Sequence, residues 1–467
     1  MTGVFCHGRI FAPSFKKGRV EFVDGMIIEI FHVGPLDDIE LPSDTNVIDL
    51  ENRIVIPAFI DAHAHILYYG HSLRKLNLTD CTSLDRIREP ITLYAKANPS
   101  IPRIMCQGWF QSTINGVALA SMLDDLDLRA ILIDSFDYHS MCSRFSWGTI
   151  HRDKHGRASG FLQDPALIKF AWSFVESLYS THDKLRALDM AFSSHTAAGY
   201  TWVVDMAINE ETWKLLAQYR RDRHVSFNIA AYWLIPFSND QQANLSYVDR
   251  AIELNMKYKA PGFTVVGIKI VCDGVVDGCT AVLLQPYSAG GIQCAIHATG
   301  DKAVNQAINV LAEVGSPSRR HRIEHLDLTT SDDAKRLGEL GITASIQPVH
   351  SDPTLLKAWP SLTGPDRCGR AFAYKEFLDG GAPLAIGTDA PSARHLPFPN
   401  LYNATTRRSA LDPESRKAIN PHLGLNLAQA ATTATTSAAS LKKGLSADFV
   451  VTWYRGKNVY DADAHRT

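Results

Sequence analysis

Residues 54–70 read IVIPAFIDAHAHILYYG, and this stretch decides how the rest of the chain is interpreted. An apolar segment typical of a buried strand ends in His63 and His65, with one alanine between them. On an ideal strand, two residues separated by one position share a face, so both imidazoles can hold one metal ion. Either histidine alone is more often an ordinary surface or core residue. The pair therefore needs further ligands elsewhere before it indicates a metal site.

Seven later apolar segments resemble the first one, and helical patterns separate most of them. Alternating strands and helices are typical of a parallel sheet, and eight such units predict a (β/α)8 TIM-like barrel of the α/β class. The eight segments are 54–63, 200–206, 226–233, 264–271, 292–298, 320–326, 341–348 and 382–390.

Both ends of the chain carry short β-type segments. Residues 3–50 contain several, with Asp24-Gly25 as a hairpin signal, and the last thirty residues contain more. Two β-rich ends predict a small β-sandwich domain formed by both chain termini. The predicted division is 1–53 for the N-terminal part of the sandwich, 54–420 for the barrel with an insertion at about 70–195, and 421–467 for a C-terminal helix and the return to the sandwich.

Composition narrows the class of protein. The 467 residues have a formal net charge of −2, so neither nucleic acid nor an anionic membrane is an expected partner. The apolar runs are strand-sized and far below the ~20 residues of a membrane span. The cysteines are scattered, without a Cys-x-x-Cys pair, and the first residues do not read as a secretion signal. We therefore expect a cytoplasmic protein that acts on a small molecule, with a homodimer left open.

Metal-competent side chains also lie in or at the ends of later predicted strands. Lys269 lies in the fourth, His297 ends the fifth, His325 ends the sixth and Asp389 ends the eighth. The carboxyl ends of all strands in a parallel barrel open on one face. Alone, Lys269 would be a paired lysine, and Asp389 would cap the following helix. Together with the first histidines they predict a site for one or two divalent ions, with zinc expected and manganese, iron or cobalt as alternatives.

Several of these stretches resemble one known group of enzymes, the amidohydrolase superfamily, and within it amidohydrolase family 3. The resemblance runs over residues 1–460 and rests on VIPAFIDAHAH, GIKIVCDG, AIHATGDKA, HRIEHL, AIGTDAP and GLSADFVV. It implies a barrel with a β-sandwich from both termini and a Lys269 carbamylated by CO₂ that bridges two metals. It also implies that one ion is held by His63, His65 and Asp389, and the other by His297 and His325.

The resemblance also suggests where the substrate pocket lies. It places QGWFQS (107–112) and DSFDYHSM (134–141) along the pocket, with Trp109 and His139 as the candidate contacts. The alternative is that both residues are structural within the insertion. Asp273, after the Lys269 strand, either faces the pocket or shapes a turn, and Tyr68 could form a wall of the site. Asp301, after His297, could instead orient a ligand histidine.

The residues suggest a mechanism of hydrolysis. A divalent ion lowers the pKa of bound water from 15.7 to about 7, and Asp389 is placed to accept the water proton and return it to a leaving nitrogen. This predicts cleavage of an amide, formamide or N-acyl C–N bond by water. The alternatives are a deaminase, a decarboxylase, a carbon–carbon hydrolase, or a non-catalytic scaffold on the same fold. A deaminase is disfavoured because Gly300 stands where superfamily deaminases typically carry Glu.

Four connections are short for this architecture, near 145–151, 289–291, 440–445 and 451–452. The clearest is 289–291, where a parallel crossover normally needs a dozen or more residues and carries a helix. Either these loops are naturally trimmed, or the natural chain has further residues there. We expect the second, and an intact mass equal to 51.6 kDa would contradict it.

Overall fold

The structure is a computed structural model of the chain. It describes residues 2–10, 16–23, 26–31, 46–51, 53–109, 119–127, 129–135, 150–162, 173–223, 227–236, 240–258, 262–273, 291–314, 319–435, 453–454 and 457–458.

Eight parallel strands form the centre of the molecule. They pair in the order β18-β17-β16-β15-β14-β13-β12-β6, and a parallel bridge between Ala64 and Ala390 joins the two edges. Each strand falls within or across its predicted segment, so the predicted (β/α)8 barrel is confirmed. The strands are β6 Phe59–Ala64, β12 Tyr200–Ile208, β13 Asn228–Leu234, β14 Phe263–Val271, β15 Gln293–Ala298, β16 Arg322–His325, β17 Thr343–Ile346 and β18 Leu384–Ile386.

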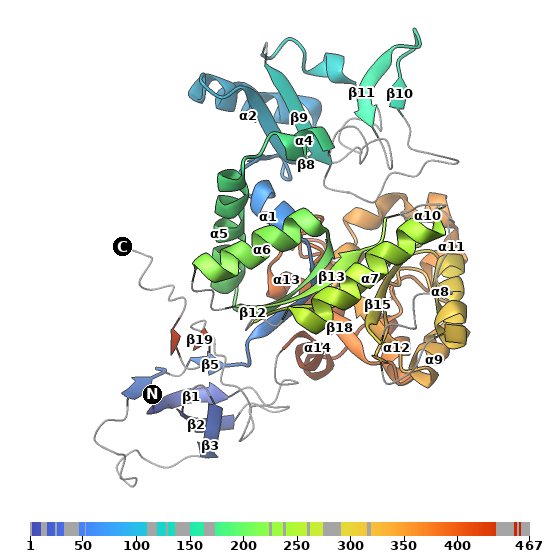
Figure 1. Ribbon diagram of the computed structural model, residues 1–467. Coiled ribbons are helices and arrows are strands. Elements are labelled where there is room, and N and C mark those ends of the chain that lie inside the picture. The colour runs from blue at the N-terminus through green and yellow to red at the C-terminus, as the bar shows by residue number, and fades with distance from the viewer. Residues whose placement is uncertain are drawn as a thin grey trace.

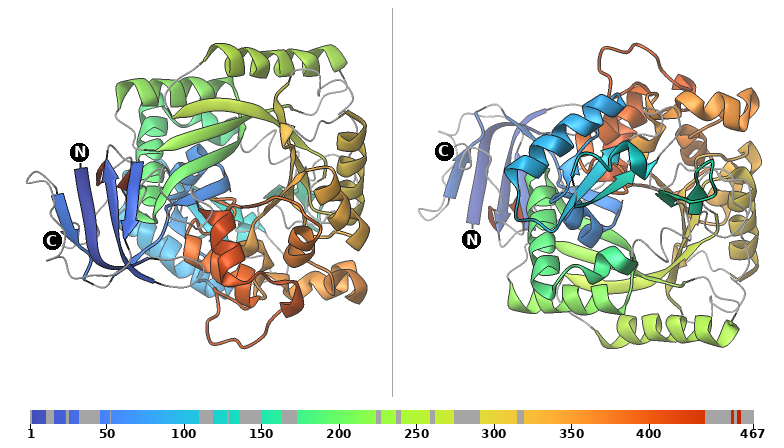
Figure 2. Two further views of the ribbon diagram at one scale, coloured as in Figure 1. Left: turned by 90° about the horizontal axis from the view of Figure 1, so that it is seen from below. Right: turned by 90° about the horizontal axis from the view of Figure 1, so that it is seen from above.

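Helices surround this barrel, as Figure 2 shows in views from below and from above. Most of the buried apolar side chains lie between the strands and this helical layer. The principal helices are α5 Thr181–Ala197, α6 Glu210–Asp222, α7 Gln241–Lys257, α8 Asp301–Val314, α9 Ser331–Glu339, α12 Tyr374–Asp379, α13 Pro397–Thr406 and α14 Leu427–Ala434. Shorter ones are α1 Ile66–Ser72, α4 Ser173–Ser177, α10 Trp359–Thr363, α11 Pro365–Cys368, η7 Pro348–Ser351, η8 Leu355–Ala358 and η9 Pro421–Leu423.

A second sheet is built from the N-terminal strands and lies beside the barrel (Figure 1). Its order is β3-β2-β1-β4, with β5 also paired to β1. Its strands are β1 Thr2–Ile10, β2 Lys16–Val23, β3 Met26–Phe31, β4 Asn46–Asp49 and β5 Ile54–Val55, and the C-terminal pair is β19 Trp453–Tyr454 and β20 Lys457–Asn458. Figure 1 shows β19 next to these N-terminal strands. The predicted hairpin turn Asp24-Gly25 lies outside the described residues, and the division into domains stays a prediction.

The insertion after the first barrel strand has a hydrophobic core of its own. Its parallel sheet has the order β7-β8-β9, and an antiparallel pair β10-β11 follows. In Figure 1 these elements lie above the barrel. They are β7 Leu76–Asn77, α2 Leu84–Ala97, β8 Arg103–Trp109, η3 Ala120–Met122, β9 Ala130–Ser135, β10 Ile150–Arg152 and β11 Ala158–Leu162.

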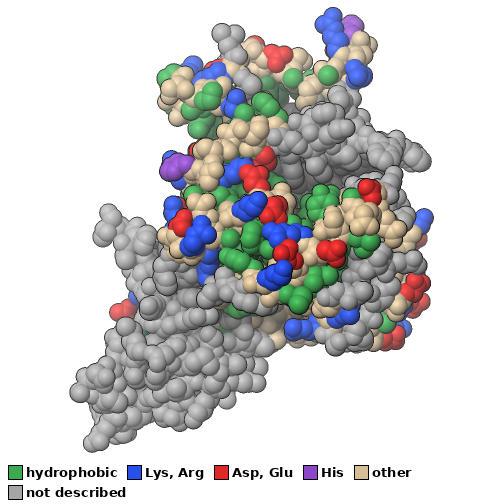
Figure 3. All heavy atoms as spheres, viewed as in Figure 1, with side chains coloured by type: hydrophobic (Ala, Val, Ile, Leu, Met, Phe, Trp, Pro, Cys, Tyr) green, Lys and Arg blue, Asp and Glu red, His purple; other side chains and the backbone are tan. Residues whose placement is uncertain are grey.

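The outer surface of the barrel is mixed in charge. Figure 3 shows basic and acidic side chains mixed over α6 and α7. Arg250 of α7 pairs with both Glu210 and Glu253. This agrees with the small net charge of the chain. Among the described residues, no helix is long and apolar enough to cross a membrane. The short connections 289–291, 440–445 and 451–452 lie wholly or largely outside the described residues.

The barrel closes where β6 meets the segment that follows β18. The backbone N–H groups of Thr388 and Asp389 donate to the carbonyl of His63, at 3.2 and 2.7 Å. The buried carboxylate of Asp61 accepts from the Thr388 N–H at 2.9 Å and from its hydroxyl at 2.6 Å. This closing seam fixes Asp389 beside His63.

Gly387 is required at this seam because the two backbone segments approach too closely for a side chain. A Cβ atom built on Gly387 would lie 2.4 Å from the backbone nitrogen of His63 and 2.5 Å from its Cβ. Neither atom belongs to a flexible side chain, so the strands themselves would have to move.

Gly387→Ala should therefore lower the free energy of unfolding by about 1–3 kcal/mol or more, the usual cost of overpacking. Thermal unfolding measures the change. Gly369→Ala is the matched control, because a Cβ there meets its nearest neighbour, the Pro365 carbonyl oxygen, at an ordinary 3.4 Å. Equal stability of the two variants would show that the seam is not closely packed.

Candidate metal centre

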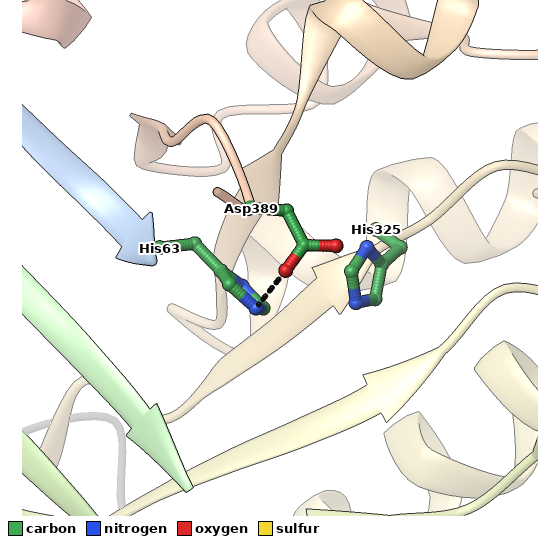
Figure 4. A group of neighbouring side chains, drawn as sticks. All are labelled: His63, His325 and Asp389. Carbon is green, nitrogen blue, oxygen red and sulfur yellow. Dashed lines mark ion pairs between the residues drawn. The ribbon is translucent and has the colours of Figure 1, made fainter. Parts of the chain in front are cut away.

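Three buried side chains meet at the carboxyl-terminal mouth of the barrel. His63 comes from β6, His325 from β16, and Asp389 follows β18 (Figure 4). One ligand atom from each lies within 4.8 Å of the others. These residues are more than three hundred positions apart at the extremes, and the barrel alone brings them together. A set of two imidazoles and one carboxylate suits a divalent transition ion.

Two of the three residues have unusual backbone conformations. His325 has φ +77° and Asp389 has φ +58°, a region that side chains other than glycine and asparagine rarely adopt. Side chains of consecutive residues on a regular strand point to opposite faces. The left-handed conformation at His325 breaks this alternation, so that Glu324 and His325 both reach the site. Such strain is typical of functional positions.

The carboxylate of Asp389 is surrounded by imidazoles. Its Oδ1 lies 3.3 Å from Nε2 of both His63 and His65, and its Oδ2 lies 3.6 Å from Nε2 of His350. Burial alone would raise the pKa of Asp389, but the nearby histidines His63, His65 and His325 hold it well below the usual value. Asp389 is therefore ionised in this pocket.

A buried carboxylate orients His63 from the other side of its ring. Nδ1 of His63 lies 2.6 Å from Oε2 of Glu324, which in turn accepts from the guanidinium of Arg322. Arg322 also donates to the Ala62 carbonyl at 2.7 Å and to the Ser345 hydroxyl at 2.6 Å. This arrangement leaves Nε2 of His63 for the site, as carboxylate partners of metal-binding histidines do. Burial and Lys269 lower the pKa of His63, but Asp389 and Glu324 raise it overall.

His297 and His325 lie side by side at the carboxyl ends of β15 and β16. Their ring centroids are 4.4 Å apart, and burial followed by the nearby His297 and His63 lowers the pKa of His325 well below its ordinary value. Nε2 of His297 lies 3.5 Å from Oδ1 of Asp273. His325 is thus neutral, the form in which imidazole binds a metal.

Lys269 lies in the same interior, close to these groups. Its Nζ is buried, and no described residue accepts from it. Burial is the main reason why the pKa of Lys269 falls to about 8, although Glu324 and Asp389 oppose this effect. A sizeable fraction of the amine is therefore neutral near pH 8.

These observations test whether the residues fit a metal ion. An ionised carboxylate, a neutral imidazole and a histidine whose pKa is raised by carboxylates together favour a positive charge between them. His63, His325 and Asp389 would hold one ion. His65 contacts this set through Asp389, since its Nε2 lies 3.3 Å from Oδ1 of that carboxylate. The predicted pairing of His63 with His65 on one ion and His297 with His325 on another stays a prediction. The described cluster instead joins His63 to His325.

The predicted substrate residues have varied surroundings. Trp109 is buried in the insertion core, beside Leu78 and Ile104. His139 lies outside the described residues. Tyr68 is half-buried at the site, with its ring centroid 6.4 Å from that of His65. For Trp109 the structural alternative accounts for its position, while substrate contact stays a prediction for all three.

Asp273 shapes the turn after β15. Its carboxylate accepts from the backbone N–H groups of Thr299 and Gly300 at 3.1 and 2.9 Å, and burial raises its pKa to about 6. It also lies against His297, the histidine that Asp301 was considered to orient. Asp301 instead pairs with Arg367 at 2.8 Å. A substrate contact for Asp273 stays a prediction.

Sequence reasoning missed three residues of the site: Glu324, Arg322 and His350. Glu324 and Arg322 lie in the quoted segment HRIEHL, but strict alternation assigns Glu324 and His325 to opposite faces. His350 lies in η7, just after β17, so the rule that strand ends carry the site could have found it.

Comparison with known families agrees with this geometry. The model of the family described as "Amidohydrolase family" matches residues 46–452. The chain is 24% identical over 514 aligned residues to "Protein LONG AFTER FAR-RED 3" of Arabidopsis thaliana, covering 95% of this chain and 86% of that protein. It is 22% identical over 424 residues to "N-substituted formamide deformylase" of Arthrobacter pascens, covering 78% of this chain and 76% of that protein.

Solved structures show the same fold. An uncharacterized metal-dependent hydrolase from Pyrococcus horikoshii OT3 superimposes with a TM-score of 0.74 at 18% identity, covering 98% of this chain and all of that one (100%). Guanine deaminase from C. acetobutylicum superimposes with a TM-score of 0.57 at 12% identity, covering 96% of this chain and 90% of that one. Because the family model spans most of the sequence, the chain belongs to the amidohydrolase family, a membership that together with the His/Asp cluster supports a metal-dependent hydrolase.

Proposed function

We propose that the protein hydrolyses a non-peptide C–N bond, of the amide, formamide or N-acyl type, in a small molecule. The observation that carries the proposal is the environment of Asp389, whose carboxylate is buried, ionised and in contact with His63, His65 and His350. A carboxylate in this position can accept a proton from water and deliver it to a leaving group.

The residues of the site supply the steps of this reaction. A divalent ion, when bound, acts as a Lewis acid that makes water acidic and polarises a carbonyl oxygen. Asp389 accepts the proton of the attacking water and later donates it to the departing nitrogen. Glu324 keeps His63 in one orientation through the hydrogen bond to Nδ1.

Two observations support C–N hydrolysis over the alternatives. The relative from Arthrobacter pascens is named for the deformylation of N-substituted formamides. Gly300, whose N–H donates to Asp273, occupies the position where superfamily deaminases typically carry Glu. A decarboxylase or a carbon–carbon hydrolase would use the same ligands, so the substrate experiments below discriminate between them.

We also propose that Lys269 is carbamylated and that its carboxylate would help to hold one or two divalent ions, with zinc expected. The support is its burial, an Nζ with no hydrogen-bond partner among the described residues, and a pKa of about 8, since only a neutral amine attacks CO₂. The proposed compartment is the cytoplasm. The described cysteines Cys81, Cys272, Cys294 and Cys368 are free, which supports a reducing environment.

Asp389→Asn should lower kcat by about 10²–10⁴-fold, because it removes the proton acceptor. The assay is a panel of N-formyl, N-acetyl and cyclic amides with added zinc or manganese, and circular dichroism confirms that the variant is folded. The control is Asp301→Asn, which should keep activity. Asp301 is an acidic residue near the same barrel face, and it pairs with Arg367. Turnover by Asp389→Asn close to that of the parent would remove its proposed role.

Lys269→Ala should lower metal content and activity by roughly 10–100-fold or more, the range found for altered metal-site partners. A short carboxylic acid such as propionate should restore part of both, since it can occupy the vacated space and supply the missing carboxylate. Elemental analysis and turnover, with and without propionate, measure the effect.

Lys184→Ala is the matched control, because Lys184 is another buried lysine and pairs with Glu176 and Glu211. Propionate should not change its properties. If Lys269→Ala retained full metal content and activity, the carbamate proposal would be refuted.

A further inference from the structure

One buried polar side chain at the mouth of the barrel has no role in the mechanism above. Gln347 follows β17 and is 2% exposed. Within the described part of the chain, neither its Oε1 nor its Nε2 has a hydrogen-bond partner. Buried polar atoms are nearly always paired, and leaving both ends of an amide unpaired costs folding free energy. Such a cost points to a partner that arrives with a ligand.

The strand register directs Gln347 toward the interior of the barrel. Ser345, two positions earlier, accepts from Arg322 inside the barrel, and Ile346 between them packs in the outer core. Side chains two positions apart on a strand share a face. Gln347 continues the interior row one layer above Ser345, level with Gly387 at the closing seam.

The residues that follow return to the catalytic carboxylate. His350 lies three positions after Gln347, and its Nε2 is 3.6 Å from Oδ2 of Asp389. Its ring is nearly parallel to that of His325, at 11° and 5.9 Å between centroids. Gln347 is therefore bracketed by two residues that face the interior of the barrel, below it and above it.

We propose that Gln347 determines substrate specificity by binding an amide whose N–H and C=O lie on the same edge. A glutamine carboxamide presents one acceptor and one donor side by side, the complement of that edge. This inference rests on the proposed C–N hydrolysis and names the class of amide. Lactams, cyclic imides and primary amides present such an edge. Open-chain N-substituted amides are predominantly trans and place the two groups on opposite edges.

The test compares two compounds of similar size as inhibitors of N-formyl substrate hydrolysis: δ-valerolactam, which is cyclic, and N-ethylpropanamide, which is open-chain. In the parent protein the lactam should have a Ki roughly 10–100-fold lower, as one or two hydrogen bonds allow. Gln347→Met, which keeps the length of the side chain but cannot form these bonds, should bring the ratio of the two Ki values close to one.

Gln293→Met is the matched control. Gln293 lies in β15 and accepts from the Tyr232 hydroxyl at 2.6 Å, so it is a partnered glutamine of the same barrel. This control should keep the Ki ratio but lower the melting temperature. Gln347→Met should not lower the melting temperature, because it removes an unpaired buried amide. If Gln347 were structural and held by a trapped water, Gln347→Met would instead lose stability.

The outcomes separate the two proposals. If the parent protein hydrolyses none of the N-formyl, N-acyl or cyclic amides, the proposed function fails, and the Ki ratio is then measured by displacement of metal-bound acetohydroxamate. If the parent hydrolyses amides but Gln347→Met keeps the parental Ki ratio, the specificity role of Gln347 is overturned. Gln347→Glu, which replaces the donor with a carboxylate oxygen, supplies the same comparison should Gln347→Met fail to fold.

Discussion

The structure depends on the seam that closes the barrel between β6 and the segment after β18. There the buried carboxylate of Asp61 binds the N–H and hydroxyl of Thr388, while the His63 carbonyl accepts from the backbone of Asp389. The contact is possible because Gly387 has no side chain to separate the strands. The same hydrogen bonds that complete the fold therefore place the catalytic carboxylate next to the first histidine.

The barrel interior holds buried charged and polar groups, and only some of them are paired. Glu324 is paired with both Arg322 and His63, which makes this buried charge tolerable. Lys269 and Gln347 are buried without hydrogen-bond partners among the described residues. Natural proteins keep such costly groups mainly at functional sites. A carbamate on Lys269 and a substrate amide on Gln347 would each satisfy one of these groups.

Much of the fold could be predicted because the barrel strands are apolar runs separated by helical patterns. The metal-binding set could be predicted because a parallel barrel gathers the ends of its strands on one face. The way in which His325 enters the site could not be predicted, since its positive φ breaks the alternation from which side-chain direction is inferred. Trp109 shows a second limit. An aromatic residue in a pocket and one in a small core have the same sequence pattern. The structure packs Trp109 with Leu78 and Ile104, and its contact with a substrate stays a prediction.

The central claim is that His63, His325 and Asp389 hold a divalent ion. Anomalous diffraction at the zinc absorption edge, from crystals of the full chain grown with zinc, tests it most directly. The account predicts a peak about 2.0–2.2 Å from a nitrogen of His63, a nitrogen of His325 and an oxygen of Asp389, the usual distances for zinc ligands. A fully ordered site with no anomalous peak near these three residues would contradict it.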